Sequence, residues 1–287
     1  MNRLDETHFK RVEKCPWCGG NEKRILYKNQ YDACIQECNH CKLVYSDKIL
    51  NEQGLEIYWN SYLSQVQNKD TLLTQKRMEM YDIEFQFISR LIDLKDKEVL
   101  DIGCGSGAFL GFFEDAGANC YGVEYGDEAS KEAEKRFKIW KGEFPKIEIE
   151  GKFDLIIFRG SLQYCINPKQ YLKKAMELLN KDGILFITSS PNAQSLCFKL
   201  FKENFTLPVS VTDYYGFSEP LITDYIKMLG GRLLCYHYFY EETPYADMEE
   251  DIMTVAKAIE YFRKNLKIDF KAPAFYDNML TLVYQKS

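Results

Sequence analysis

The sequence predicts an α/β fold in which helices cover both faces of a mostly parallel sheet. Residues 99–110 combine the end of an apolar strand, a glycine-rich turn and the start of a helix. A second strand, at 120–124, follows that helix and ends in an acid. A third apolar run, at 153–158, is typical of a strand buried on both faces. Strands that alternate with helices in this way are the pattern of a parallel sheet.

Length and composition limit the possible functions. A chain of 287 residues can bury one large core and carry a small accessory module. Its formal net charge of −6 argues against a nucleic-acid partner, because binding a phosphate backbone needs a basic surface. No apolar run reaches the roughly 18 to 20 residues that cross a bilayer, so we expect no membrane partner. Residues 1–6 are too charged for a secretory signal, so we expect a cytoplasmic protein with reduced cysteines.

The glycine-rich turn predicts a binding site for a small ligand. Gly103, Gly105 and Gly107 alternate behind Asp101, and a helix is expected over 108–116. Glycines let a ligand approach bare backbone, and the N-terminus of the following helix suits a carboxylate or a phosphate. The spacing loosely fits a dinucleotide fingerprint, but a carboxylate at 101 would repel a pyrophosphate. It would instead attract a ligand that carries an ammonium group.

The second acid supports a nucleoside. Glu124 ends the strand at 120–124 and is placed to accept hydrogen bonds from two ribose hydroxyls. Enzymes that bind NAD and enzymes that bind S-adenosylmethionine (SAM) both use this device, so it does not choose between them. The alternative is a surface glutamate just before a helix that starts at Asp127.

Further elements continue the alternation of strands and helices. Asn167 and Pro168 are an N-cap and a first helical residue. The loop at 159–165 follows the strand at 153–158, on the edge where such sheets bind ligands. The expected order is a helix at 128–137, a short strand near 139–140, the strand at 153–158, a helix at 169–179, a strand at 184–188 and a ligand-side loop at 189–192.

Two cysteine pairs predict a zinc ribbon at the N-terminus. Cys15 and Cys18 form one C-x-x-C knuckle, and Cys38 and Cys41 form the other. Four thiolates complete a closed tetrahedral shell, which leaves no position for water, so we expect a structural Zn²⁺. Residues 24–31 are expected to form a hairpin arm between the knuckles.

A helical segment connects the ribbon to the sheet. Residues 46–54 are expected to be a linker, and the aromatic stretch at 55–62 is either a lid over a ligand or a helix packed on the main domain. A helix is expected over 71–92, with a buried stripe of core residues. That stripe consists of Met80, Ile83, Phe87 and Leu91.

The pattern from Asp101 through Gly107, with the order of elements up to 192, resembles the class I SAM-dependent methyltransferases. The resemblance implies a Rossmann-like, mostly parallel seven-stranded sheet with SAM bound at its carboxyl edge. Many relatives carry an acid and a histidine where this chain has Gln163 and Tyr164, so a catalytic histidine cannot be transferred to that loop. The resemblance implies that the cofactor-binding residues are Asp101, Gly103, Gly105, Gly107, Glu124, Tyr125, Glu143, Phe144, Arg159 and Gly160.

The C-terminal third is expected to complete the sheet and to cover the site. Residues 193–217 are irregular and aromatic, which favours an active-site cover. A helix at 218–229, a strand at 232–240, an inserted helix at 248–265 and a last strand at 279–284 follow. We expect a ribbon at 1–47, a helical linker or lid at 48–95 and a methyltransferase domain at 96–287, with cover segments at about 193–217 and 241–278.

Methyl transfer to a hydroxyl would need a base, and the sequence offers few candidates. They are His237, Tyr164, Asp213 and Tyr214. The chain as a whole resembles small bacterial methyltransferases that act on sugars, nucleotide-sugars or polysaccharide precursors, which implies a small-molecule acceptor. Three alternatives stay open: an RNA methyltransferase that grips RNA with its ribbon, an NAD-dependent oxidoreductase, and an inactive partner module. The inserted helix could also support a homodimer.

Overall fold

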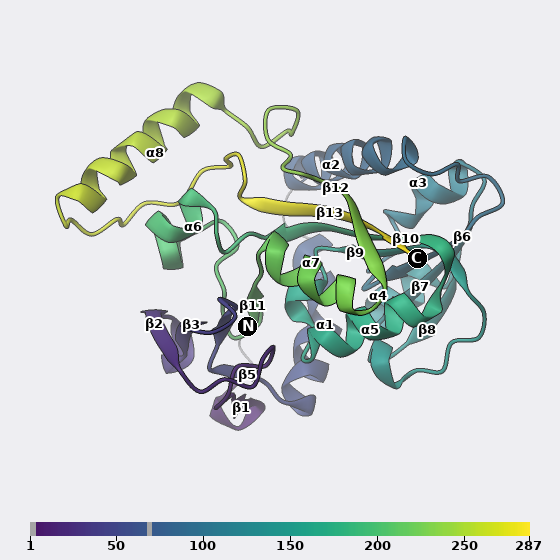
Figure 1. The fold of residues 1–287 in the computed structure, drawn as a ribbon, viewed down its shortest axis with the longest axis horizontal. Helices are drawn as coiled ribbons and strands as arrows, with labels where there is room; N and C mark the ends of the chain where they lie inside the picture. Colours follow the sequence, from purple (N-terminus) through teal and green to yellow (C-terminus); the bar gives the residue numbers. More distant parts are fainter. Residues whose placement is uncertain (1–3, 68–70) are drawn as a thin grey trace.

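A computed structural model describes residues 4–67 and 71–287 of the chain. A seven-stranded sheet lies at its centre (Figure 1), in the spatial order β12, β13, β10, β9, β6, β7 and β8. The strands β6 to β10 run parallel, and β13 is antiparallel to both of its neighbours. The predicted mostly parallel sheet is therefore confirmed. Its strands are β6 (Glu98–Ile102), β7 (Asn119–Glu124), β8 (Lys138–Lys141), β9 (Phe153–Arg159), β10 (Leu179–Pro191), β12 (Gly231–His237) and β13 (Met279–Lys286).

Helices cover both faces of this sheet, which explains the apolar runs of its central strands. Leu155 and Ile157 of β9 belong to a cluster that includes residues of α2 and α3. Ile156 and Phe158 belong to a second cluster, on the opposite face, with residues of α5 and α7. The helices are α1 (Glu52–Gln67), α2 (Thr71–Ser89), α3 (Leu110–Asp115), α4 (Asp127–Ala133), α5 (Pro168–Leu178), α6 (Leu196–Phe201), α7 (Glu219–Met228) and α8 (Met248–Arg263).

The N-terminal segment folds as a small β unit. A short pair joins β1 (Phe9–Arg11) to β5 (Lys48–Leu50). A four-stranded sheet contains β2 (Lys23–Lys28), β3 (Cys34–Cys38), β4 (Val44–Ser46) and β11 (Tyr215–Gly216). The expected linker at 46–54 is wrong, because β5 lies within it and α1 begins at Glu52. The polar residues of this stretch do not predict β5, because its partner, β1, lies almost forty residues earlier in the chain.

The fourth strand of that small sheet comes from the expected cover segment. Tyr215 pairs with Tyr45, and Gly216 pairs with Val44. In the same contact, Ser46 donates its backbone N–H to the carbonyl of Tyr214, at 3.0 Å. The N-terminal unit is thus joined to the cover by main-chain hydrogen bonds as well as by side chains.

Two further expectations were wrong in detail. The buried positions of α2 are Met80, Glu84 and Ile88, whereas Leu91 is 43 % exposed. The expected stripe was misplaced because a charged residue, Glu84, lies at the centre of the buried face. The expected ligand-side loop at 189–192 largely continues β10, which pairs with β13 as far as Pro191 beyond a shift in register.

Candidate active site

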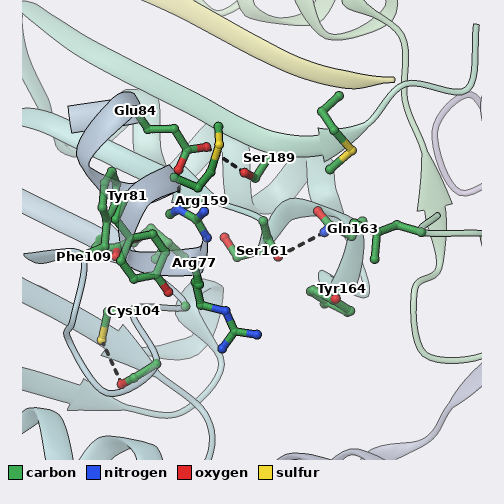
Figure 2. A pocket seen from close by; sticks show the side chains of 18 of the residues that line it. Arg77, Tyr81, Glu84, Cys104, Phe109, Arg159, Ser161, Gln163, Tyr164 and Ser189 are labelled. Atoms are coloured by element: carbon green, nitrogen blue, oxygen red, sulfur yellow. Dashed lines mark hydrogen bonds and ion pairs between the residues drawn. The ribbon is translucent and has the colours of Figure 1, made fainter. Parts of the chain in front are cut away.

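A cavity of about 740 Å³ opens at the carboxyl edge of the sheet. Its floor comes from the ends of β6, β7, β9 and β10, and its walls come from α1, α2 and the segments around 206, 240 and 275. Figure 2 shows Arg159 and Glu84 at one end of the view and Gln163 and Tyr164 at the other. A cavity of this size can hold a nucleoside ligand together with a small second molecule.

The glycine-rich turn forms part of the cavity wall. Gly105 has φ +58°, and a Cβ built there would meet no atom within 4 Å, so the backbone opens onto the cavity. Gly107 has φ +80°, but its added Cβ would lie 2.8 Å from the ring of Phe137. Of the ten residues expected to bind a cofactor, all but Gly107 line the cavity. Gly107 is therefore needed for the packing of the turn against the segment that follows α4.

Asp101 places a buried carboxylate beside this turn. The side chain is 2 % exposed, and its Oδ1 has no hydrogen-bond partner among the described residues. The pKa of Asp101 is raised to about 7: burial has the largest effect, the carboxylates of Glu124 and Glu84 also raise it, and the Arg159 guanidinium lowers it. An ionised carboxylate without a partner is costly in such a place, so the geometry calls for a cationic donor.

Glu124 is held in place by backbone donors. Its Oε2 accepts from the N–H of Gly105 at 2.9 Å, and its Oε1 accepts from the N–H groups of Tyr125 and Gly126, both at 2.8 Å. Burial raises the pKa of Glu124, and these hydrogen bonds lower it. The carboxylate thus has a fixed orientation at the tip of β7 and keeps lone pairs for hydroxyl groups of a ligand.

Arg159 is the centre of a cluster that sequence analysis only partly found. Its Nε lies 2.5 Å from Oε2 of Glu84, which is fully buried on α2. The guanidinium stacks 4.1 Å from the ring centroid of Tyr81. Oε1 of Glu84 accepts further hydrogen bonds from the hydroxyls of Thr188 and Ser189, each at 2.7 Å.

The residues that sequence analysis missed come mainly from α2. Arg77, Met80, Tyr81 and Glu84 line the cavity, although the stripe of this helix was expected to be core alone. One signal was available: a charged Glu84 four residues after Met80, on the face expected to be apolar. Arg77 has no hydrogen bond or ion pair within the described part of the chain and points into the cavity (Figure 2).

Unpaired polar atoms also line the cavity. Ser161 Oγ, Gln163 Oε1 and Asn278 Oδ1 are buried without a hydrogen-bond partner in the described ranges, and all three residues line the cavity. Buried polar groups are normally paired, so these atoms indicate a ligand that supplies hydrogen-bonding groups. Apolar and aromatic residues line the same cavity. They include Leu207, Phe239, Tyr240, Phe275 and Met279.

The four candidate catalytic residues separate into two groups. Tyr164 lines the cavity, whereas Asp213 does not. Tyr214 is 1 % exposed and lies outside the cavity lining. His237 lies on β12, where Nε2 is 2.9 Å from Glu242 Oε1 and the ring stacks on Phe87. Neither His237 nor Tyr214 lines the cavity, so their catalytic roles stay predictions.

The four expected metal ligands converge on one point. The Sγ atoms of Cys15, Cys18, Cys38 and Cys41 all lie within 4.8 Å of one another. Those of Cys15 and Cys41, and those of Cys18 and Cys38, are 3.5 Å apart. Tetrahedral Zn²⁺ with bonds of about 2.3 Å places sulfurs about 3.8 Å apart, so this donor set fits the ion.

Comparisons with known proteins point to one family. The model of the methyltransferase domain family matches residues 75–218. A ubiquinone biosynthesis O-methyltransferase of Coxiella burnetii is 28% identical over 165 residues, which cover 53% of this chain and 70% of that protein. One from Nitrosospira multiformis is 26% identical over 156 residues, covering 50% and 65%.

Solved structures share the fold. Magnesium protoporphyrin IX methyltransferase from Synechocystis, with bound SAH, has a TM-score of 0.57 at 14% identity and covers 83% of this chain and 100% of its own. A possible histamine N-methyltransferase from Thermotoga maritima has a TM-score of 0.54 at 15% identity, with 81% and 99% covered. Among the described residues, no helix is both long and apolar enough to span a bilayer.

The Glu84–Arg159 pair leads to a prediction about stability. Glu84→Ala should lower the free energy of unfolding by about 3–5 kcal/mol, because it leaves a buried guanidinium without its counter-ion. Glu79→Ala, on an exposed position of the same helix, should change it by less than about 0.5 kcal/mol. Urea titrations followed by circular dichroism measure both. Equal effects of the two substitutions would show that the pair does not hold α2 on the sheet.

Proposed function

This chain belongs to the methyltransferase domain family, and from that premise we propose that it transfers a methyl group from SAM to a hydroxyl oxygen of a small, polyhydroxylated acceptor. A sugar or a nucleotide-sugar is the acceptor class we favour. Bound SAM supplies a methyl group activated by a positively charged sulfur, so the protein must mainly align the acceptor and exclude water.

The observation that carries the SAM assignment is the unpaired carboxylate oxygen of Asp101. The ammonium group of SAM is the donor that this buried oxygen requires, and Glu124 suits the ribose hydroxyls. Four acids line the cavity, Glu84, Asp101, Glu124 and Glu143, against two arginines, Arg77 and Arg159. An excess of negative charge favours a cationic ligand and disfavours the pyrophosphate of a nicotinamide dinucleotide.

By the same reasoning, Glu143, Phe144 and Tyr125 are proposed to surround the adenine. All three line the cavity on the side of β7 and β8, beyond Glu124. Phe144 is 1 % exposed and packs on Tyr171 with ring centroids 5.8 Å apart, so its position is fixed before any ligand binds. An aromatic face and a carboxylate side by side suit a purine ring and its exocyclic amine.

The acceptor class rests on unpaired polar atoms of the cavity lining. The unpaired atoms of Ser161, Gln163 and Asn278 suit an acceptor with several hydroxyl groups, and the aromatic walls suit the apolar face of a sugar ring. The relatives named O-methyltransferase support oxygen as the acceptor atom. The net charge of −6 disfavours RNA as the acceptor.

We further propose that the four cysteines hold a structural Zn²⁺. Four thiolates fill its coordination shell, so the ion would take no part in methyl transfer. Its role would be to stabilise the N-terminal unit. That unit contains β4, the strand with which β11 of the cover pairs. Trp17, which lies within the first knuckle, packs on Phe217 of the cover, with ring centroids 6.0 Å apart.

The SAM assignment predicts how the binding of SAH, the demethylated product, depends on pH, because SAH keeps the ammonium group. Because burial raises the pKa of Asp101 to about 7 and the ligand needs the ionised carboxylate, affinity should be full above pH 7 and fall below it. Calorimetry should show Kd rising about tenfold between pH 8 and pH 6.

Two controls separate this effect from a general loss of binding at low pH. Asp101→Asn should weaken SAH binding at pH 8 and abolish the pH dependence. Methylthioadenosine, which lacks the ammonium group, should bind the unaltered protein with little change between the two pH values. A pH-independent Kd for SAH in the unaltered protein would contradict the assignment of Asp101.

The acceptor class is tested with labelled SAM and a mixture of UDP-glucose, UDP-N-acetylglucosamine and GDP-mannose. We expect label in the sugar products and little in catechol, which serves as an aromatic hydroxyl probe. Gln163→Met keeps the shape of the side chain but removes its polar atoms, so it should raise KM for the sugar at least tenfold. Preferential labelling of catechol would refute the sugar assignment.

The zinc proposal predicts one Zn²⁺ per chain by elemental analysis. A strong chelator should lower Tm by more than about 5 °C, because bound metal stabilises the folded state. Cys38→Ser should remove the metal, whereas Cys34→Ser, outside the cluster, should retain it. Purified protein without metal, and with a Tm insensitive to chelator, would exclude the site.

A further inference from the structure

Three tyrosines form an exposed aromatic cluster, which we call the tyrosine platform: Tyr236, Tyr238 and Tyr276. The side chains of Tyr236 and Tyr276 are 55% and 57% exposed. The half-buried Tyr238 contacts both, with ring centroids 5.6 Å from Tyr236 and 5.4 Å from Tyr276. Within the described part of the chain, none of the three hydroxyls takes part in a hydrogen bond. Exposed aromatic side chains that gather in this way are typical of a binding surface.

The end of β12 connects the platform to the cavity. This strand is at the edge of the large sheet (Figure 1) and runs parallel to β10, because both are antiparallel to β13. It therefore ends at the carboxyl edge of the sheet, where the cavity opens. Tyr236 lies on β12 and Tyr238 directly follows it, and the next two residues, Phe239 and Tyr240, line the cavity.

A turn at 275–278 makes the same connection from a second segment. The N–H of Asn278 donates to the carbonyl of Phe275 at 3.2 Å. Phe275 and Asn278 both line the cavity, whereas Tyr276 between them is exposed. The Phe275 ring packs on Tyr240 with centroids 5.5 Å apart, in the cavity wall, and Tyr276 packs on Tyr238 at the surface. Two ring contacts thus join the same two segments, one in the cavity and one on the platform.

The composition of these segments favours an uncharged ligand. Residues 233–240 and 272–279 contain no lysine or arginine, and Asp277 is their one acid. A phosphate group beside them would find no counter-ion in either segment, which disfavours an anionic ligand on the platform. A tyrosine offers an apolar ring face together with a hydroxyl that can donate and accept. A sugar ring, with an apolar face and hydroxyls around its rim, matches both.

We propose that the tyrosine platform binds the sugar units of the acceptor that lie beyond the methylated one. The acceptor class is then a chain of neutral sugars, one end of which enters the cavity. This inference rests on the proposed function and adds to it the length and the charge of the acceptor. The unpaired Oδ1 of Asn278, which we assign to the acceptor, is two residues from Tyr276, so a chain can contact both. A single sugar fills the cavity alone and binds more weakly.

Binding to the platform is tested without methyl transfer, by NMR of the full chain carrying carbon-13 in its tyrosine rings and saturated with SAH. The probes are glucose, cellohexaose, maltohexaose, mannohexaose and UMP. At least one hexasaccharide should shift the resonances that Tyr236→Ala and Tyr276→Ala remove, with Kd at least about tenfold below that of glucose. Shifts by UMP alone would assign the platform to a nucleobase, and the absence of binding by every hexasaccharide would also overturn the proposal.

Exposed aromatic residues allow a matched comparison of variants. Tyr236→Ala and Tyr276→Ala should each raise Kd for the bound hexasaccharide at least about fivefold, with little change for glucose, which does not reach the platform. Phe262→Ala is the control, because Phe262 is 60% exposed on α8 and lies outside the cavity lining. It should leave hexasaccharide binding unchanged. An equal loss in all three variants would show that the platform is not the binding surface.

Kinetics with labelled SAM test whether the platform serves the reaction. The hexasaccharide that binds should have KM at least about tenfold below that of glucose with a similar kcat, because the platform does not contact the reacting atoms. Tyr276→Ala should remove this difference in KM. Equal KM values for the two acceptors in the unaltered protein would overturn the proposal. Absence of SAH binding would instead refute the proposed function, whatever the NMR result for the platform.

Discussion

The buried ion pair between Glu84 and Arg159 is the contact on which the shape of the cavity depends. Neither charge could stay in this position alone, because an unpaired ion in an apolar interior is very costly. Arg159 ends β9, and Glu84 lies on α2, so their contact fixes the helix against the carboxyl edge of the sheet. The hydroxyls of Thr188 and Ser189 add β10 to the same cluster.

This pair also sets the electrostatics of the site. The positive charge of Arg159 lowers the pKa of Asp101 and so opposes the effect of burial on that carboxyl. Since Glu84 already neutralises Arg159, Asp101 keeps an unsatisfied oxygen for a ligand. An arginine without Glu84 would instead favour an anion here. The selectivity that we propose for a cationic donor therefore depends on a residue of α2 that never has to touch it.

The N-terminal unit takes part in the same architecture through the cover segment. Its strand β4 pairs with β11, so the loop that precedes β11 is held from both sides, by β4 and by the carbonyl of Gln163. Asp213 lies in that loop. Although the four cysteines are far from this loop in sequence, the unit that contains them pairs with the cover segment through β4 and β11. A structural metal would contribute to function here by positioning, without contact with the reacting atoms.

The sequence by itself determined the elements whose chemistry is local. The turn with Gly103 and Gly105, the acids at the tips of two strands and the paired cysteines could all be found, because the residues of each motif lie close together in the chain. Only the tertiary structure decided the rest of the site. Glu84 and Arg159 are 75 positions apart, Tyr238 and Tyr276 come from separate segments, and β11 finds its partner in the N-terminal unit. Such contacts depend on how helices and covers pack on the sheet. Packing is a property of the whole core. The misplaced stripe of α2 shows that the periodicity of a single segment does not predict it.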